Sequence, residues 1–307
     1  MTGKPNYVLA RDYLDNNRLN LHHYLITELF GYHIHPDIPI KDNNNLRIAD
    51  VGTGTGVWIT DLARRLPASV QLDALDISFD SAPPAEWLPS NVKTFKWDVK
   101  QDVPEELVGV YDVVHIRLFI FVLLDAEVQP VLERILKLLS ELIPLASPLN
   151  PSLPLSILAS VYFIYQAKLP PSEPGGYIQW TEVDMGSTRT ESTHPANSTE
   201  ALTKMIRLSE GQDERLRPRW VPSLASKMTT AGYENVKEDA RDAPPHLALA
   251  LHDCNIMIHE TFARKFKNPQ TAQVLNELIP EVEKETKEGS CLAHTRYTVV
   301  GRKPLTQ

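Results

Sequence analysis

Residues 46–58 read LRIADVGTGTGVW, and this stretch decides the fold. The apolar run 46–51 predicts a buried strand, because short aliphatic runs bounded by glycine are typical of parallel sheets. Three glycines follow at alternate positions, where glycine lets the backbone turn tightly and approach a ligand closely. Residues 57–66 predict a helix that ends at Pro67. A strand, a glycine loop and a helix in this order indicate an α/β nucleotide-binding unit.

The same alternation continues along the chain and predicts an α/β fold, a largely parallel sheet covered by helices on both faces. Further strands are expected at 70–77, 92–97, 111–116, 176–183, 232–236 and 296–302. Further helices are expected at 17–30, 127–139, 199–210, 221–231, 246–266 and 270–287. We expect a helical cap at 1–45 and an α/β domain at 46–304, in which 197–290 forms a largely helical lid over the substrate.

Composition and charge exclude several classes of protein. The 307 residues include 31 basic and 39 acidic side chains, a net charge of −8, so nucleic acid is not expected as a direct partner. Cys254 and Cys291 form no CxxC pair, which argues against a zinc or redox site. The first residues lack the apolar core of a secretory signal, and the longest apolar run, 153–165, is shorter than the roughly 18 residues that span a bilayer. We expect a cytoplasmic protein without membrane contact.

The glycine spacing points to one kind of cofactor. The loop reads GxGxG, whereas dinucleotide-binding loops read GxGxxG and place a pyrophosphate on the helix N-terminus. S-adenosylmethionine (SAM) carries no phosphate but presents an amino-acid group, a sulfonium, a ribose and an adenine. Asp50 leads the loop and suits the cationic amine of SAM better than a pyrophosphate.

Two more carboxylates follow the next two strands. Asp76 ends the second strand and lies 20 residues after Gly56, where a carboxylate can accept hydrogen bonds from both ribose hydroxyls. Asp98 follows the third strand, at the edge of the sheet where the adenine amino group would lie. The alternative is a generic glycine-rich turn with two surface aspartates.

Several motifs together resemble a known family. They are NRLNLHH at 17–23, the stretches 46–58 and 91–98, YDVVHIRL at 111–118, PGGYIQW at 174–180 and VVGRKP at 299–304. On these motifs the sequence resembles the class I SAM-dependent methyltransferases, most closely the fungal LaeA-like group, from about Tyr7 to Pro304. The resemblance implies a Rossmann-like sheet of seven strands whose last strand is antiparallel. It also implies SAM at the carboxyl ends of the first strands.

The cofactor site that follows from the loop, the carboxylates and the resemblance comprises eleven residues. They are Asp50, Gly52, Thr53, Gly54, Gly56, Asp76, Ile77, Asp98, Val99, His115 and Arg117. His115 is also the candidate catalytic base, because the fourth strand of this fold ends at the transferable methyl and histidine titrates near neutral pH. The alternative is that His115 packs in the core or only supports the cofactor.

The resemblance also gives candidates for the substrate pocket. In this family the N-terminal segment closes over the cofactor, so Tyr13, Arg18 and His22 could line the site; a solvated helix face is the alternative. Trp180 and Glu182 end the fifth strand, and His252 lies on a C-terminal helix. His252, Cys254 and His259 share that helix, but no third metal ligand accompanies the two histidines, so no metal is expected.

One segment departs from the family pattern. Residues 141–172 contain six prolines, 17 apolar residues and two charges, which is unusual for a connection between a helix and a strand. We interpret 140–173 as an insertion that is a translated intron: removing 99 bases in frame would regenerate the family turn Leu-Leu-Lys-Pro-Gly-Gly. A lipophilic flap over a hydrophobic substrate or partner is the rival interpretation. Sequencing the transcript distinguishes them.

The leading functional interpretation is methyl transfer from SAM to the oxygen, nitrogen or carbon of a small molecule in fungal secondary metabolism. The alternative is a LaeA-like regulator that acts with a protein partner in the nucleus. A nicotinamide-dependent oxidoreductase is disfavoured by the GxGxG spacing. An inactive homologue is a further alternative if the insertion is present in the protein.

Overall fold

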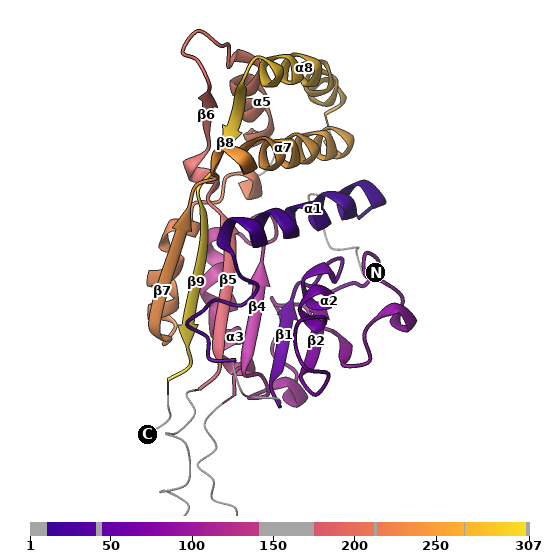
Figure 1. Ribbon diagram of the computed structural model, residues 1–307, viewed down its shortest axis with the longest axis vertical. Helices are drawn as coiled ribbons and strands as arrows, with labels where there is room; N and C mark the ends of the chain where they lie inside the picture. Colours follow the sequence, from indigo (N-terminus) through magenta and orange to yellow (C-terminus); the bar gives the residue numbers. More distant parts are fainter. Residues whose placement is uncertain (1–10, 41–44, 141–174, 212–213, 267, 305–307) are drawn as a thin grey trace, which may run out of the picture.

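The computed structural model describes residues 11–40, 45–140, 175–211, 214–266 and 268–304. Within this part the main sheet has seven strands in the order β3-β2-β1-β4-β5-β9-β7. Strands β3, β2, β1, β4 and β5 are parallel, and β9 runs antiparallel to both β5 and β7 (Figure 1). The predicted class I methyltransferase sheet is therefore confirmed. Its strands are β1 Arg47–Val51, β2 Gln71–Asp76, β3 Val92–Lys96, β4 Val113–Arg117, β5 Tyr177–Val183, β7 Glu234–Arg241 and β9 Arg296–Arg302.

Successive residues of the buried strands point to opposite faces of the sheet. In β1, Ile48 packs into one hydrophobic cluster while Ala49 and Val51 pack into another. Helix α2 (Val57–Ala63) contributes Trp58 to the first cluster. Helices α3 (Val128–Leu138) and α6 (Leu224–Thr230) cover the second. Both faces of the sheet are thus covered, as the uninterrupted apolar strands predict.

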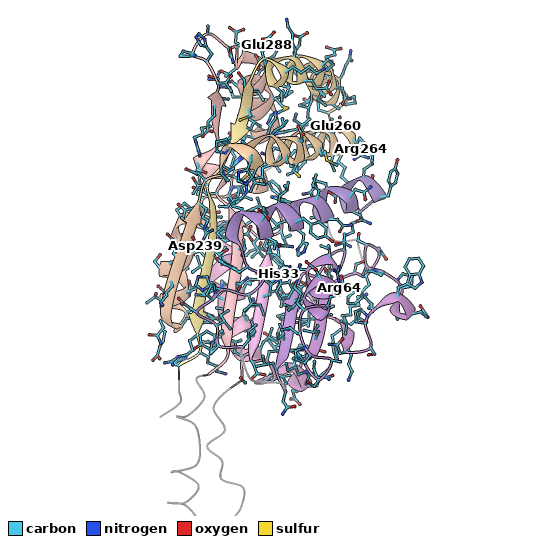
Figure 2. All side chains as sticks on the ribbon, in the orientation of Figure 1. His33, Arg64, Asp239, Glu260, Arg264 and Glu288 are labelled. Atoms are coloured by element: carbon cyan, nitrogen blue, oxygen red, sulfur yellow. The ribbon has the colours of Figure 1, made fainter. Side chains whose placement is uncertain are left out.

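Helix α1 (Tyr13–Phe30) is the helix in the described part of the predicted cap. It begins at Asp12, whose side chain accepts hydrogen bonds from two backbone N–H groups, and ends at Gly31 with φ 70°. Figure 1 shows α1 between the ends of the parallel strands and the upper helices. Its apolar residues pack against α7 (Pro245–Lys265), and Arg264 of α7 lies 2.9 Å from Asp12 (Figure 2). These contacts fix α1 over the carboxyl ends of the strands.

The predicted lid divides into two parts. Helices α5 (Glu200–Glu210), α7 and α8 (Pro269–Lys287) pack together beyond α1, whereas α6 and β7 belong to the main sheet layer. A two-stranded antiparallel sheet, β6 (Arg189–Ser192) with β8 (Ser290–Ala293), links the lid to β9. The sequence did not predict these two short strands. None of the described helices combines the length and the apolar composition needed to cross a membrane.

The anomalous insertion falls almost entirely outside the described residues, which resume at 175. Its two flanks nevertheless meet in space. The N–H of Gly176 donates to the carbonyl of Ser140 at 3.1 Å, and the N–H of Ser140 donates to the carbonyl of Tyr111 at 2.8 Å. The sheet therefore closes directly across the insertion point. That the segment is translated intron stays a prediction.

Candidate active site

A cavity of about 280 Å³ opens at the carboxyl ends of β1, β2, β3 and β4, beneath α1. Ten of the eleven predicted cofactor residues line it, and they come from four successive strand ends. The exception is Gly56, which has φ 70° and begins α2. The site residues that the sequence pattern selects are therefore brought together.

The glycine loop keeps the floor of this cavity free of side chains. Gly52 and Gly54 have φ values of 70° and 56°, a conformation that disfavours residues with a Cβ. The N–H groups of Gly52 and Thr53 both donate to the carbonyl of Leu75, at 2.7 and 3.3 Å, so the loop is tied to β2. A Cβ at Gly52 would overlap the ring of Phe119.

The two carboxylates after β2 and β3 both face the cavity. Asp76 accepts hydrogen bonds from the N–H of Gly54 at 2.9 Å and of Ser78 at 3.1 Å. Burial raises its pKa above the usual value for aspartate, although these backbone bonds oppose the shift. Asp98 accepts from the N–H of Lys100 at 2.9 Å. Both carboxylates are fixed in orientation before any ligand binds.

Asp50 and His115 are directly opposite on β1 and β4. His115 Nδ1 donates to Asp50 Oδ1 at 2.8 Å, and the Thr53 hydroxyl donates to Oδ2 at 2.7 Å. The imidazole stacks on the indole of Trp58 with ring centroids 3.6 Å apart and a 2° angle between the planes. Burial lowers the pKa of His115 below its usual value, against the opposing effect of Asp50. A neutral His115 therefore holds one oxygen of Asp50 in place.

Arg117 ends β4 and is the cationic group of the cavity at this strand end. Among the described residues no carboxylate forms an ion pair with Arg117; its Nη2 instead donates to His23 Nδ1 at 3.0 Å. Burial lowers the pKa of Arg117 to about 10, so the guanidinium remains charged at neutral pH. Arg117 is partly buried, and a cation that lacks a carboxylate partner in such a position is costly unless a ligand supplies the negative charge.

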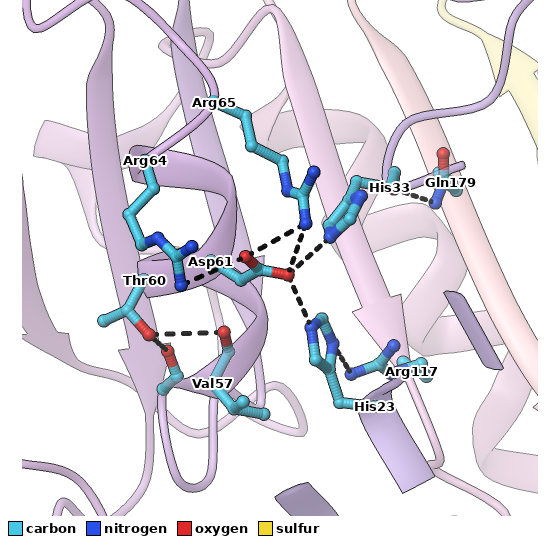
Figure 3. Close-up of polar contacts among 10 residues, drawn as sticks. His23, His33, Val57, Thr60, Asp61, Arg64, Arg65, Arg117 and Gln179 are labelled. Atoms are coloured by element: carbon cyan, nitrogen blue, oxygen red, sulfur yellow. Dashed lines mark hydrogen bonds and ion pairs between the residues drawn. The ribbon is translucent and has the colours of Figure 1, made fainter. Parts of the chain in front are cut away.

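His23 also contacts Asp61 of α2, and this carboxylate binds two histidines of the cap (Figure 3). Its Oδ2 lies 3.1 Å from His23 Nε2 and 2.7 Å from His33 Nε2, and Arg65 and Arg64 approach the same carboxylate at 3.3 and 3.9 Å. These hydrogen bonds and charges hold the pKa of Asp61 well below its usual value despite its burial. The potential ligand atoms of His23, His33 and Asp61 lie within 4.8 Å of one another, a spacing that would suit a metal ion. The arginines already balance the charge of Asp61 there.

Replacing Asp61 by Asn is expected to destabilise the docking of the cap. The variant removes a buried charge that holds two histidines and an arginine, and loss of one partner from such a cluster costs about 3 kcal/mol. Urea unfolding followed by circular dichroism measures the effect. Arg64→Gln is the matched control, because Arg64 is 76% exposed and lies at the periphery of the same carboxylate. Equal stabilities for Asp61→Asn and Arg64→Gln would contradict this role.

A second cavity of about 50 Å³ lies between α1, α7 and the ends of β4 and β5. It shares Leu19, Leu118 and Phe121 with the first cavity, so the two are neighbours. Arg18 and His22, both predicted pocket residues, line it. The remaining candidate on α1, Tyr13, is 72% exposed and lines neither cavity.

Three other predicted pocket residues lie in the core and line neither cavity. Glu182 accepts hydrogen bonds from the backbone N–H of Phe119 at 2.5 Å and from the indole of Trp180 at 2.7 Å. His252 pairs with the Thr286 hydroxyl at 2.8 Å and accepts from the N–H of Leu292 at 3.1 Å, between α7, α8 and β8. Trp180, Glu182 and His252 are 0% exposed, so their partners are internal. This placement corrects the expectation that they face a substrate.

Sequence reasoning missed several lining residues. Trp58 covers His115, and Leu118, Phe119 and Phe121 form the wall just after β4. The motif VVHIRL ends at Leu118, and the apolar residues 119–122 that follow it are the signal in the sequence for this wall. Asn255 and His294 of the second cavity carry no local signal, because they reach it only through the packing of the lid.

The chain is similar in sequence to several fungal methyltransferases. No protein-family model matches the chain. Methyltransferase grgD of a Penicillium species is 31% identical over 199 residues, which cover 61% of this chain and 56% of the relative. N-methyltransferase tcpN of Claviceps purpurea is 33% identical over 35% of this chain and 38% of its own length. The secondary metabolism regulator LAE1 of Hypocrea atroviridis is 29% identical over 38% of this chain and 32% of its own length. The matches thus span about half or less of these relatives.

Solved structures are similar at lower identity. The phosphoethanolamine N-methyltransferase 2 of Haemonchus contortus, solved with SAM, has a TM-score of 0.45 and 15% identity, with coverage of 94% of this chain and 52% of that one. The [4+2]-cyclase SpnF has a TM-score of 0.44 and 15% identity over the full length of both chains. The fold assignment itself rests on the strand order and directions described above.

Proposed function

We propose that this chain, which resembles the fungal class I methyltransferases in sequence and has their sheet order, transfers a methyl group from SAM to a small-molecule acceptor in secondary metabolism. One observation carries the proposal: the cavity at four strand ends is lined by a glycine loop, two fixed carboxylates and a partly buried arginine that forms no ion pair with a described carboxylate. The names of the relatives support it, since tcpN is by name an N-methyltransferase and LAE1 a regulator of secondary metabolism.

The polar groups of the cavity match SAM part by part. Asp76 would accept hydrogen bonds from the two ribose hydroxyls, and Asp98 faces the adenine. Asp50 supplies negative charge for the ammonium of the amino-acid end, and Arg117 supplies the positive charge that its carboxylate needs. Glycine at position 52 lets the ring of Phe119 pack against the loop, because a side chain there would overlap that ring. The bound cofactor supplies an electrophilic methyl on a sulfonium.

The residues around that methyl have mainly to position and enclose the reactants. Methyl transfer is an in-line displacement, so alignment of the acceptor supplies much of the rate enhancement. Leu118, Phe119 and Phe121 form an apolar wall beside the glycine loop and keep water out. We assign His115 to holding Asp50 in position, since its Nδ1 is already bound there and its ring is covered by Trp58. Direct proton abstraction by Nε2 is the competing role.

The positioning role of His115 predicts different effects for two substitutions. In His115→Asn the side-chain amide can still donate to Asp50, so affinity for S-adenosylhomocysteine should stay within about threefold of the wild type. His115→Ala leaves Asp50 without that donor and should weaken binding about tenfold or more. Isothermal titration calorimetry measures both. If Asn and Ala variants bind equally, His115 does not act through Asp50, and the base role gains support.

Calorimetric titration of the 307-residue chain with S-adenosylhomocysteine and with NADH tests the proposed cofactor. We expect saturable binding of one S-adenosylhomocysteine and no detectable binding of NADH. Binding of NADH alone would identify an oxidoreductase and overturn the proposal. Methyl incorporation from labelled SAM into a panel of fungal metabolites then separates an enzyme from a regulator.

The resemblance to LAE1 supports a second candidate function. A LaeA-like regulator would bind SAM in the same cavity but would act in a nuclear protein complex rather than turn over a free metabolite. Binding of S-adenosylhomocysteine without any small-molecule product, together with recovery of a stable protein partner from nuclei, would favour this function.

A further inference from the structure

The second cavity adjoins the first at three apolar side chains that line both, Leu19, Leu118 and Phe121. A buried water needs roughly 10–15 Å³ of such space. The volume of about 50 Å³ therefore accommodates about three to five waters, which is close to the size of one six-membered ring. Any molecule in it would lie beside the first cavity, beneath helix α1.

One of these three shared residues, Leu118, has a strained backbone conformation. Leu118 has φ 60°, one of only two non-glycine residues with positive φ in the described part of the chain. This conformation costs about 1 kcal/mol or more for a residue with a side chain, and it persists where the surroundings require it. Leu118 directly follows Arg117 at the end of β4 and lines both cavities. The strained backbone therefore places an apolar side chain where the two cavities adjoin.

His22 supplies an unsatisfied polar group to the second cavity. The residue is 3% exposed, and neither Nδ1 nor Nε2 has a hydrogen-bond partner among the residues that the structure describes. Leaving such a group unpaired in the interior costs about 1–3 kcal/mol, so buried polar atoms without partners mark positions for a ligand. A neutral imidazole offers one N–H donor and one acceptor lone pair. The complementary ligand group must therefore both donate and accept a hydrogen bond.

The surroundings of His22 are rich in positive charge. Arg18 of the same helix is ion-paired to Asp15 at 2.7 Å, whereas Arg117 of β4 and Arg296 of β9 pair with no carboxylate among the described residues. Burial, reinforced by Arg296, Arg18 and Arg117, holds the pKa of His22 well below its usual value. The other two histidines of the cavity are already engaged: His259 with the Ser209 hydroxyl at 2.7 Å and His294 with the Asn255 amide at 3.4 Å.

From these observations we infer that the second cavity holds the methyl acceptor, and that His22 selects an uncharged hydroxyl or amide group on it over an ammonium group. The inference rests on the proposed function and names its substrate class. Arg296 pairs with no described carboxylate and disfavours a cationic ligand in this low-dielectric region, whereas a hydroxyl or amide matches both nitrogens of the imidazole. The apolar residues that line the cavity accommodate the rest of a compact ligand about the size of one ring.

Titration of the ¹⁵N-histidine-labelled chain with phenol and benzylamine tests the inference, because these probes have one ring each and differ in their polar group. The titrations are followed by NMR of the imidazole nitrogens with S-adenosylhomocysteine at saturation. Phenol is expected to shift the His22 resonances saturably at millimolar concentration, and benzylamine should bind at least tenfold more weakly. Equal binding of the two probes, or no response of His22 to phenol, would overturn the inference.

Two substitutions show whether the polar atoms of His22 are responsible. His22→Gln keeps a donor and an acceptor and should retain phenol binding, whereas His22→Phe keeps the bulk but should lose it. His246→Gln is the control, since His246 is exposed at the start of α7. Phenol binding by His22→Phe equal to that of the wild type would contradict the role of His22. A chain that binds phenol but no S-adenosylhomocysteine would refute the proposed function, and with it the acceptor role of the cavity, and would leave only the selectivity of His22 for a hydroxyl group.

Discussion

Between pH 7 and pH 5 the protein is expected to lose about 5 kcal/mol of its free energy of unfolding. The cause is a set of histidines that are buried in the neutral form. Burial lowers the pKa of His23, His252 and His259 to about 4 and that of His294 to about 3, whereas histidine in an unfolded chain titrates near 6.5. A loss of this size approaches the whole stability of many domains.

The direction of the effect follows from proton binding. Below pH 6.5 the unfolded chain takes up protons that the folded chain refuses until about pH 4, so the stability is complete above pH 6.5 and is lost as the pH falls. Each of these histidines costs about 2 kcal/mol between pH 7 and pH 5. Glu182 opposes them, because burial raises its pKa to about 8 and the folded chain then holds a proton that the unfolded chain releases. That carboxyl offsets roughly 2–3 kcal/mol over the same range.

Urea unfolding at half-unit steps of pH measures this dependence. His252→Gln should be less stable than the wild type at pH 7 but should have a shallower pH dependence, by about 1.4 kcal/mol per pH unit below pH 6. The exposed His246→Gln serves as the control and should follow the wild-type curve. A stability that is constant from pH 7 to pH 5 would mean that these histidines are not buried as the structure has them.

Asp76→Ala is expected to weaken binding of S-adenosylhomocysteine by a factor of about 100 or more. Hydrogen bonds to a charged group contribute about 1.5–3 kcal/mol each, and the two ribose hydroxyls would both lose their acceptor. The N–H of Gly54, which Asp76 holds at 2.9 Å, also loses its partner, so the glycine loop becomes less ordered. Calorimetry of the variant at a temperature well below its unfolding transition measures the loss.

Two companion variants make this result specific. Asp76→Asn retains one acceptor oxygen and should bind with intermediate affinity, about tenfold weaker than the wild type. Asp80→Ala removes a nearby exposed carboxylate that lines neither cavity and should leave the affinity unchanged. Wild-type affinity in Asp76→Ala would remove Asp76 from the site and would call for a different placement of the ribose.

The cofactor side of the site was predictable because its information is local. Asp50, the glycines, Asp76 and Asp98 each lie at or just after the carboxyl end of a strand that can be recognised from its apolar residues. Parallel strands bring their carboxyl ends to one edge, so correct strands imply a correct cluster. The link from Arg117 to His23 and on to Asp61 was not predictable in this way. Arg117 and His23 are 94 positions apart in the sequence, and His23 and Asp61 are 38 positions apart. Their contacts therefore depend on how α1 packs against the sheet.

Trp180 and Glu182 show a second reason for failure. Side chains of a strand alternate between the two faces, and only the position in the sheet decides which face meets a pocket. In β5, Gln179 reaches the cap, where its side chain contacts the backbone of His33 and His35, while Trp180 and Glu182 turn into the main core. The sequence indicated where β5 ends, but it did not indicate which of its alternating side chains face the core.

The hydrogen bond between Gly176 and Ser140 has a practical consequence for protein engineering. Because the residues on either side of the insertion are hydrogen-bonded to each other, the sheet tolerates inserted segments of different length at this point. The entropic cost of closing a loop grows only as the logarithm of its length. The insertion point lies at the amino-terminal edge of β5, whereas the candidate site lies at the carboxyl edge of the strands. It is therefore a natural position for a fused reporter domain or an affinity handle, remote from the ligands whose binding it would report.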